Sequence, residues 1–137
     1  MKLYLDTNIF LDAILDRKNL SNRDLSNSAN SLFLQAISCK HHIIISSWTL
    51  KELSNHITPN RGIFSLLKPK IIKVIHDEED LIKAKNLSKG DADDALHVVL
   101  AEKSGAESIV TRNLKHFLKI ETQIPISLPE EIISQNH

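Results

Sequence analysis

The chain of 137 residues is the length of one domain, since a domain takes about 150 residues. Hydrophobic residues make up 42% and charged residues 25% of the sequence, which excludes a disordered chain. The 17 basic and 17 acidic residues balance to a net charge of zero, which argues against a protein coated with nucleic acid and leaves local patches open.

Residues that make turns and disulfides are scarce. Only 3 Gly and 4 Pro occur, which argues against an all-β sandwich or barrel and favours helices with short connections. The single Cys excludes a disulfide framework and a zinc ribbon. The N-terminus carries acids within its apolar run, and no segment has the roughly 18 uncharged apolar residues of a membrane span. We therefore expect a soluble, cytoplasmic protein.

Short apolar segments alternate with longer segments of helical spacing along the chain. The short segments are predicted strands buried on both faces of a sheet: Leu3–Leu5, Ile43–Ile45, Ile71–Ile75, Ser108–Val110 and Ile124–Ile126. The longer segments are predicted helices: Ile9–Leu15, Ser28–Ser38, Thr49–His56, Glu78–Leu87 and Ala92–Ser104. This alternation predicts an α/β fold in one domain with a central, mostly parallel sheet. Residues 19–30 and 58–69 are expected to be irregular, and Pro129 is expected to open a short terminal helix.

Acid and amide side chains follow several of the predicted strands. In an open parallel sheet, ligands bind outside the carboxyl ends of the strands. Groups from four chain segments are expected there: Asp6, Glu52, Asp91 with Asp94, and Asn113. Oxygen ligands of this kind are what Mg²⁺ and Mn²⁺ require, so the pattern predicts a pocket for a divalent cation.

Each of these side chains also has an explanation that needs no ligand. Asp and Asn are preferred at helix N-termini, so Asp6, Asn8, Asp91 and Asn113 are each acceptable as helix caps. Glu52 is acceptable as an ordinary surface residue. Capping explains any one of these residues, but independent caps have no reason to converge on one place.

The predicted helix Ala92–Ser104 separates two adjacent acids. At about 100° per residue, Asp94 falls between Val98 and Ala101 on the apolar side, whereas Asp93 falls on the polar side beside His97. An acid on an apolar face needs a partner or a metal, because an unpaired buried charge is costly. Asp94 is therefore predicted to point inward and Asp93 to point into solvent.

Taken in order, these residues resemble the PIN domain family. The features are Asp6-Thr7-Asn8 after the first strand, Glu52, the run from Asp91 to His97, and the run from Ile109 to Asn113 followed by Phe117. The resemblance extends from Met1 to about Pro129 and implies a three-layer α/β/α sandwich with the activity of a Mg²⁺- or Mn²⁺-dependent endoribonuclease. Family members of this size include VapC-type toxins of toxin–antitoxin pairs. The resemblance therefore implies an RNA substrate, an antitoxin partner and a homodimer.

The resemblance also implies roles for individual residues. Asp6, Glu52 and Asp94 match the three main acidic residues of the family, and Asp91 is an additional candidate metal ligand. Asn113 stands where many members carry a fourth Asp, so one negative charge is missing and the number of bound cations stays open. Thr7, Asn8 and Thr111 match the supporting polar positions of the family. Asn113, which replaces the fourth Asp, is counted with them as a supporting residue.

Basic residues gather in one part of the sequence despite the neutral total. No acid occurs between Leu53 and Ile75, and together with Arg112 this segment is a candidate rim for RNA phosphates. An equally acceptable explanation is a solvated segment balanced by the four acids of residues 77–80. The candidate RNA-binding residues are Arg61, Lys68, Lys70, Lys73 and Arg112.

A second class of function stays open, namely a non-catalytic PIN-like module that binds RNA or a protein. Asn113 favours this alternative slightly, whereas the set of three acids argues against it. A phosphatase with Asp6 as nucleophile is disfavoured, because no second Asp follows two residues later. The histidines lack zinc-site spacing, His97 is expected to have a structural or supporting role, and Trp48 is expected in the core.

Overall fold

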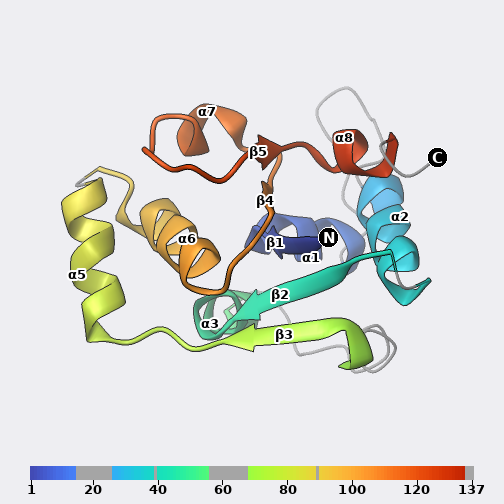
Figure 1. Ribbon diagram of the computed structural model, residues 1–137, viewed down its shortest axis with the longest axis horizontal. Helices are drawn as coiled ribbons and strands as arrows, with labels where there is room; N and C mark the ends of the chain where they lie inside the picture. The colour runs from blue at the N-terminus through green and yellow to red at the C-terminus, as the bar shows by residue number, and fades with distance from the viewer. Residues whose placement is uncertain (15–25, 39, 56–67, 89, 135–137) are drawn as a thin grey trace.

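The computed structural model describes residues 1–14, 26–38, 40–55, 68–88 and 90–134. Within these residues, five parallel strands form one sheet in the order β3-β2-β1-β4-β5 (Figure 1). The first strand therefore lies at the centre of the sheet. The strands are β1 (Lys2–Leu5), β2 (His42–Ser46), β3 (Ile71–Val74), β4 (Ser108–Val110) and β5 (Ile126–Ser127).

Helices cover both faces of this sheet, which confirms the predicted α/β/α sandwich. One face packs against α1 (Thr7–Ile14), α2 (Ser26–Ile37) and α8 (Pro129–Ser134). The other face packs against α5 (Glu78–Leu87), α6 (Ala92–Lys103) and α7 (Leu114–Phe117). The helix α3 (Ser47–Ser54) follows β2, and a 3₁₀ turn, η1 (Lys68–Lys70), precedes β3. No helix in the described parts of the chain is long and apolar enough to cross a membrane.

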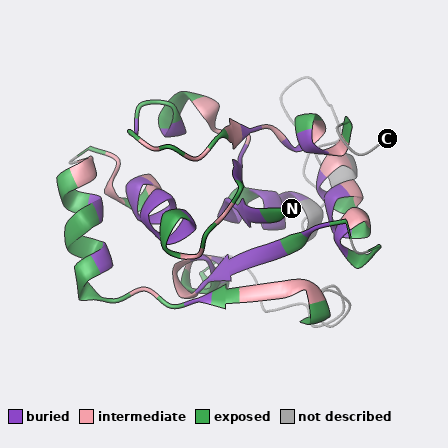
Figure 2. Ribbon diagram, in the orientation of Figure 1, coloured by how far each residue is buried: buried purple, intermediate pink, exposed green. Residues whose placement is uncertain are grey.

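The strands divide the apolar residues between two cores. In β1, Leu3 and Leu5 enter the core on the α1 side, whereas Tyr4 enters the core on the α6 side. In β2, Ile43 and Ile44 divide in the same way. Successive side chains of a strand point to opposite faces, so a continuous apolar run supplies both cores. Figure 2 shows that β2 is buried along most of its length.

The helix boundaries differ from the prediction where local hydrogen bonds decide them. The helix α1 begins at Thr7, because Ile9 N already donates to the Asp6 carbonyl, 3.0 Å away. The helix α3 begins at Ser47, because the Ser46 side chain caps it by accepting a bond from Thr49 N. The predicted bounds of α5 are confirmed, and its Asp77 forms a reciprocal capping box with Asp80.

Other departures concern short or polar segments. The helix α2 begins at Ser26, inside the segment predicted to be a loop, and the last strand is Ile126–Ser127 rather than Ile124–Ile126. The four-residue helix α7 was not predicted, because it is too short to show a helical period. The terminal helix opened by Pro129 and the packing of Trp48 against a core are both confirmed.

A partly buried arginine, Arg112, joins the carboxyl end of β4 to three helices. Arg112 Nε donates to Asp12 Oδ2 at 3.1 Å, and its Nη1 donates to Glu130 Oε1 at 2.8 Å. Its Nη2 donates to Ser28 Oγ at 2.6 Å. These bonds join the residue after Thr111 to α1, α8 and α2, so the C-terminal helix is held against the rest of the domain.

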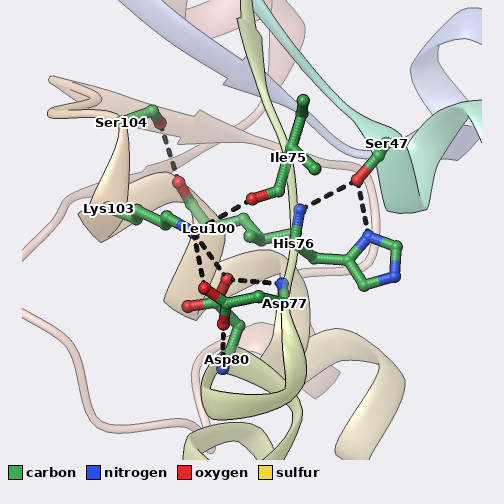
Figure 3. Close-up of polar contacts among 8 residues, drawn as sticks. All are labelled: Ser47, Ile75, His76, Asp77, Asp80, Leu100, Lys103 and Ser104. Carbon is green, nitrogen blue, oxygen red and sulfur yellow. Dashed lines mark hydrogen bonds and ion pairs between the residues drawn. The ribbon is translucent and has the colours of Figure 1, made fainter.

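On the opposite side of the sheet, a lysine joins α6 to the start of α5. Lys103 Nζ donates to Asp80 Oδ2 at 2.9 Å and to the carbonyl of Ile75 at 2.9 Å (Figure 3). Nearby, Ser47 Oγ accepts from His76 N at 2.9 Å, which joins α3 to the segment after β3. These contacts hold α5 against α6 and join α3 to the segment that leads into α5.

The contact between Arg112 and Glu130 gives the fold a predictable response to acid. Burial raises the pKa of Glu130, but the hydrogen bonds from Arg112 and Ser28 outweigh burial, and the pKa lies below its usual value of 4.5. At pH 7 we expect Glu130→Gln to lower the free energy of unfolding by about 1 kcal/mol. The contribution of a carboxylate with a lowered folded pKa is complete above the unfolded pKa and disappears as the pH falls through the folded pKa. Urea unfolding from neutral to strongly acidic pH measures this change.

The exposed Glu121 offers a matched control, since Glu121→Gln removes the same charge without removing a contact to Arg112. A difference between wild type and Glu130→Gln that stays constant over the whole pH range contradicts the assignment.

Candidate functional site

Acidic side chains line a cleft at the N-terminal end of α6. The cleft has a volume of about 470 Å³, and Glu52 and Asn113 line it together with residues from the start of α6. These groups come from α3, α6 and the segment between β4 and α7, which are far apart in the sequence. The structure therefore brings together most of the acid and amide groups that the sequence singled out. The polar residues of the cleft are Glu52, Asp91, Asp93, Asp94, Asn113 and His116.

Asp6 lies at the end of the central strand and is held by β4. Its backbone N–H donates to the Val110 carbonyl at 2.9 Å, and Thr111 Oγ1 donates to its Oδ2 at 3.0 Å. Asp6 is only 4% exposed and is absent from the described residues that line the cleft, but its charge acts on Asp94. Asp6 and Asp94 are thus close enough to interact electrostatically.

Asp94 lies where negative charge is concentrated. Burial raises its pKa above the usual value, the negative charges of Asp6 and Asp91 raise it further, and the two histidines His97 and His116 only partly oppose this effect. Like charges disfavour ionisation of a neighbouring carboxyl. A cation in the cleft would favour the ionised form of Asp94.

Asp91, Asp94 and His116 form a group that fits a metal ion. Their ligand atoms all lie within 4.8 Å of one another. His116 Nδ1 lies 3.6 Å from Asp91 Oδ1 and 3.7 Å from Asp94 Oδ2, which is too long for hydrogen bonds. Two carboxylates and one imidazole form a donor set for divalent cations. The donor chemistry of this group therefore agrees with the pocket predicted from the sequence.

The position of His116 was missed in the sequence analysis. The one sequence feature that could have placed His116 at the cleft is its spacing of three residues from Asn113. Residues three apart lie on the same side of a helix, so both side chains can face the cleft. This spacing is informative only if residues 114–117 form a helix, and the four-residue helix α7 was not predicted.

Glu52 is held by two hydrogen-bond donors. Thr7 Oγ1 donates to Glu52 Oε1 at 2.8 Å, and His97 Nε2 donates to the same oxygen at 2.7 Å. Glu52 lies in the second turn of α3, Thr7 begins α1, and His97 lies in α6. Three helices thus meet at one carboxylate oxygen.

His97 is a buried, charged partner of Glu52. Burial lowers its pKa, but the electrostatic effect of Tyr4, the hydrogen bond to Glu52 and the charge of Asp6 outweigh burial and raise the pKa to about 10. The hydrogen bonds lead to the same state: Ser46 Oγ donates to Thr49, so the Tyr4 hydroxyl donates to Ser46 and accepts from His97 Nδ1. Both ring nitrogens are then donors, as in an imidazolium ion.

The orientation predicted for α6 is confirmed for the acids and wrong for the histidine. Asp93 is exposed and the Asp94 side chain is 24% exposed. His97 was expected on the polar side, but it is only 1% exposed. The reason is that α6 is covered almost all round, with every residue from 95 to 101 buried, so this helix has no polar side along its middle turns.

The capping explanation does not account for Asp91 and Asn113. Both residues occupy N-cap positions, of α6 and α7, but neither side chain makes a capping hydrogen bond. Asn113 instead donates its backbone N–H to Thr111 Oγ1 at 2.9 Å, and its side chain lines the cleft. Asn8, the other supporting residue of the prediction, is exposed on α1.

The basic rim is only partly visible. Lys68 and Lys73 are exposed and Lys70 is half-buried, whereas Arg61 lies outside the described residues. Arg112 does not belong to a rim: its side chain is 19% exposed, and Asp12, Ser28 and Glu130 occupy its nitrogens. Sequence proximity to Thr111 suggested a place at the cleft, but the guanidinium points to the other side of the sheet, where its partners on α1, α2 and α8 lie.

The comparisons with known proteins agree with this architecture. A family described as the PIN domain matches residues 2–115. A chain in the crystal structure of VapBC2 from Rickettsia felis, bound to a DNA fragment from their promoter, is similar in fold with a TM-score of 0.57. The two chains are 24% identical, and the alignment covers 92% of this chain and 97% of that chain. No curated protein matches the sequence.

The raised pKa of Asp94 predicts that its charge destabilises the metal-free fold. A carboxyl whose folded pKa is raised subtracts stability once the pH exceeds its unfolded pKa of about 3.8. We therefore expect Asp94→Asn to raise the free energy of unfolding at pH 7 by up to about 1 kcal/mol, with the gain disappearing in acid. Urea unfolding in the presence of a chelator measures the difference.

The adjacent Asp93→Asn is the matched control, because Asp93 is exposed and no large gain is expected there. If Asp94→Asn is less stable than wild type without metal, the proposed electrostatic strain is wrong.

Proposed function

Because the chain belongs to the PIN domain family, we propose that it is a divalent-metal-dependent endoribonuclease of the VapC toxin type. The observation that carries the proposal is the convergence of Glu52, Asp91 and Asp94 on one cleft, where burial, together with the charges of Asp6 and Asp91, raises the pKa of Asp94. Such a concentration of carboxylates is costly in a purely structural role. It is the arrangement that binding of a divalent cation requires.

The residues of the cleft fit Mg²⁺ or Mn²⁺. Asp94 and Asp91 would hold the cation, with His116 as a nitrogen donor that suits Mn²⁺ better than Mg²⁺. Asp6 would act as a ligand or through its charge on Asp94, and Glu52 would bind the cation or a water that it holds. When bound, the cation lowers the pKa of a water and offsets the charge that develops on the phosphate during hydrolysis.

The remaining polar residues orient the carboxylates or offer hydrogen bonds to water and phosphate. Thr111 Oγ1 donates to Asp6, and Thr7 Oγ1 donates to Glu52, so each hydroxyl holds one carboxylate in place. Asn8 and Asn113 would offer hydrogen bonds to water or phosphate. Asn113 brings an amide oxygen without a charge, so we expect one cation to bind firmly and a second to bind loosely.

RNA, an antitoxin and a second copy of the chain are the proposed partners. The structural similarity to a chain of the VapBC2 complex from Rickettsia felis supports the antitoxin. Lys68 and Lys70 remain candidates for contacts to RNA phosphates, as does Arg61. We propose that the protein acts on RNA in the cytoplasm.

One observation favours a second function, a PIN module that binds RNA or protein without cleaving it. Asn113 lies in the cleft where a further carboxylate would add metal affinity. A binding module keeps its function when Asp6 is neutralised, whereas a nuclease loses its activity. This difference separates the two functions.

The nuclease proposal predicts the effect of two isosteric substitutions. Asp6→Asn and Asp94→Asn each remove one carboxylate charge, so we expect each to reduce Mn²⁺-dependent cleavage of a mixed RNA pool by at least about 100-fold. The matched variant Asp93→Asn should lose less than about 5-fold, because this neighbouring side chain is exposed and lies outside the proposed ligand group. Full activity in Asp6→Asn or Asp94→Asn contradicts the proposed site.

A further prediction concerns the missing carboxylate. Asn113→Asp adds one charge to the cleft without changing the size of the side chain. At about 4 Å and an effective dielectric constant of about 20, one unit charge contributes about 4 kcal/mol before desolvation and carboxylate repulsion are subtracted. We expect a net gain of roughly 5-fold in Mn²⁺ affinity, measured by calorimetric titration. Unchanged affinity and stoichiometry would place Asn113 outside the metal site.

A further inference from the structure

A buried chain of hydrogen bonds begins and ends on the helix that carries Glu52. Starting from Glu52 Oε1, it runs to His97 Nε2 at 2.7 Å and from His97 Nδ1 to the Tyr4 hydroxyl at 2.6 Å. The Tyr4 hydroxyl then contacts Ser46 Oγ at 2.8 Å. Ser46 is the N-cap of α3, so the chain returns to the helix from which it started.

Every internal member of this chain of hydrogen bonds is buried. Tyr4 and Ser46 are fully buried in the two central strands β1 and β2, and His97 is buried in α6. The rings of Tyr4 and His97 also meet edge to face, with centroids 5.6 Å apart. Because these groups lie in the sheet and in a helix whose residues 95–101 are all buried, they form a packed frame against which Glu52 is oriented.

The frame acts on one oxygen of Glu52. Thr7 and His97 both donate to Oε1, while the Glu52 side chain lines the cleft. These two bonds to Oε1 set the direction in which the carboxylate points. A donor behind a metal-binding carboxylate fixes its orientation and tunes its affinity.

We propose that His97 is the positioning residue for Glu52, with Tyr4 and Ser46 setting the orientation of the imidazole ring. This proposal rests on the proposed metal site. It adds three residues behind Glu52 that contact neither the cation nor the RNA. In this role His97 affects metal binding through Glu52, whereas an ordinary core histidine would contribute only to stability.

Two substitutions separate the two contacts of His97. The amide nitrogen of Gln reaches the place of Nε2, whereas that of Asn reaches only the place of Nδ1. His97→Gln therefore keeps a donor for Glu52, and His97→Asn loses it. In calorimetric titration with Mn²⁺ in the absence of RNA, we expect His97→Asn to raise Kd about 10-fold and His97→Gln to raise it less than about 3-fold.

A double-mutant cycle tests whether His97 acts through Glu52. In a Glu52→Ala background, His97→Asn should change the Mn²⁺ Kd by less than about 2-fold, because the carboxylate that it orients is gone. The buried His41 provides the matched control, because it lies directly before β2, away from the cleft, and its Nε2 forms a hydrogen bond with Gln35 Oε1. His41→Asn should lower thermal stability and leave the Kd unchanged.

Tyr4→Phe keeps the proposal testable if His97→Asn does not fold. It removes only the hydroxyl that orients the ring, so we expect a Kd about 3-fold higher in the wild-type background and unchanged in the Glu52→Ala background. Equal Kd values for His97→Asn and His97→Gln, an effect that persists without Glu52, or an unchanged Kd in Tyr4→Phe overturns the positioning role. A wild-type protein that binds Mn²⁺ but cleaves no RNA refutes the nuclease alone, and one that binds no Mn²⁺ refutes both proposals.

Discussion

The central strand β1 is the constraint on which the cleft depends. It lies between β2 and β4 and is buried on both faces, so the alternation of its side chains and the place where it ends are both determined. Tyr4 must enter the core on the α6 side, where it meets His97. Asp6, the first residue after the strand, is pinned by the Val110 carbonyl and Thr111. A shift of one residue in this strand would exchange the two cores and dismantle the site.

Burial and the charges of Asp6 and Asp91 make ionisation of Asp94 unfavourable. The chain compensates part of the negative charge with histidines: His97 bonds Glu52, and His116 stands between Asp91 and Asp94. Neither removes the effect of Asp6 on Asp94, whose pKa remains raised. Arg112 follows Thr111 directly, but it neutralises Asp12 and Glu130 on the other side of the sheet and leaves the cleft negative. The guanidinium charge of Arg112 is therefore directed away from the place where a cation would bind.

Much of the architecture was predictable because it depends on local patterns. Apolar runs such as Leu3–Leu5 and Ile43–Ile45 are too short for helices and too continuous for one-sided strands, and both are buried parallel strands. Asp77 and Asp80 mark the start of α5 by a reciprocal cap that needs only neighbouring residues. The difference between Asp93 and Asp94 followed from helical geometry alone. The roles assigned to Asp6, Glu52 and Asp94 in catalysis rest on family membership and remain proposals.

The sequence by itself therefore determined the parallel α/β sandwich, the strand ends at which acids gather, and the inward direction of Asp94. The tertiary structure alone decided which long-range partners those acids have. His97 bonds Glu52 because the middle turns of α6 are buried almost all round. His116 lines the cleft because the four-residue helix α7 places it there, and Arg112 contacts Glu130 instead of the cleft. Local patterns indicate which face of a helix or strand a residue occupies. A contact between residues about 20 to 100 positions apart depends instead on how whole helices pack, and no single segment of the sequence determines that packing.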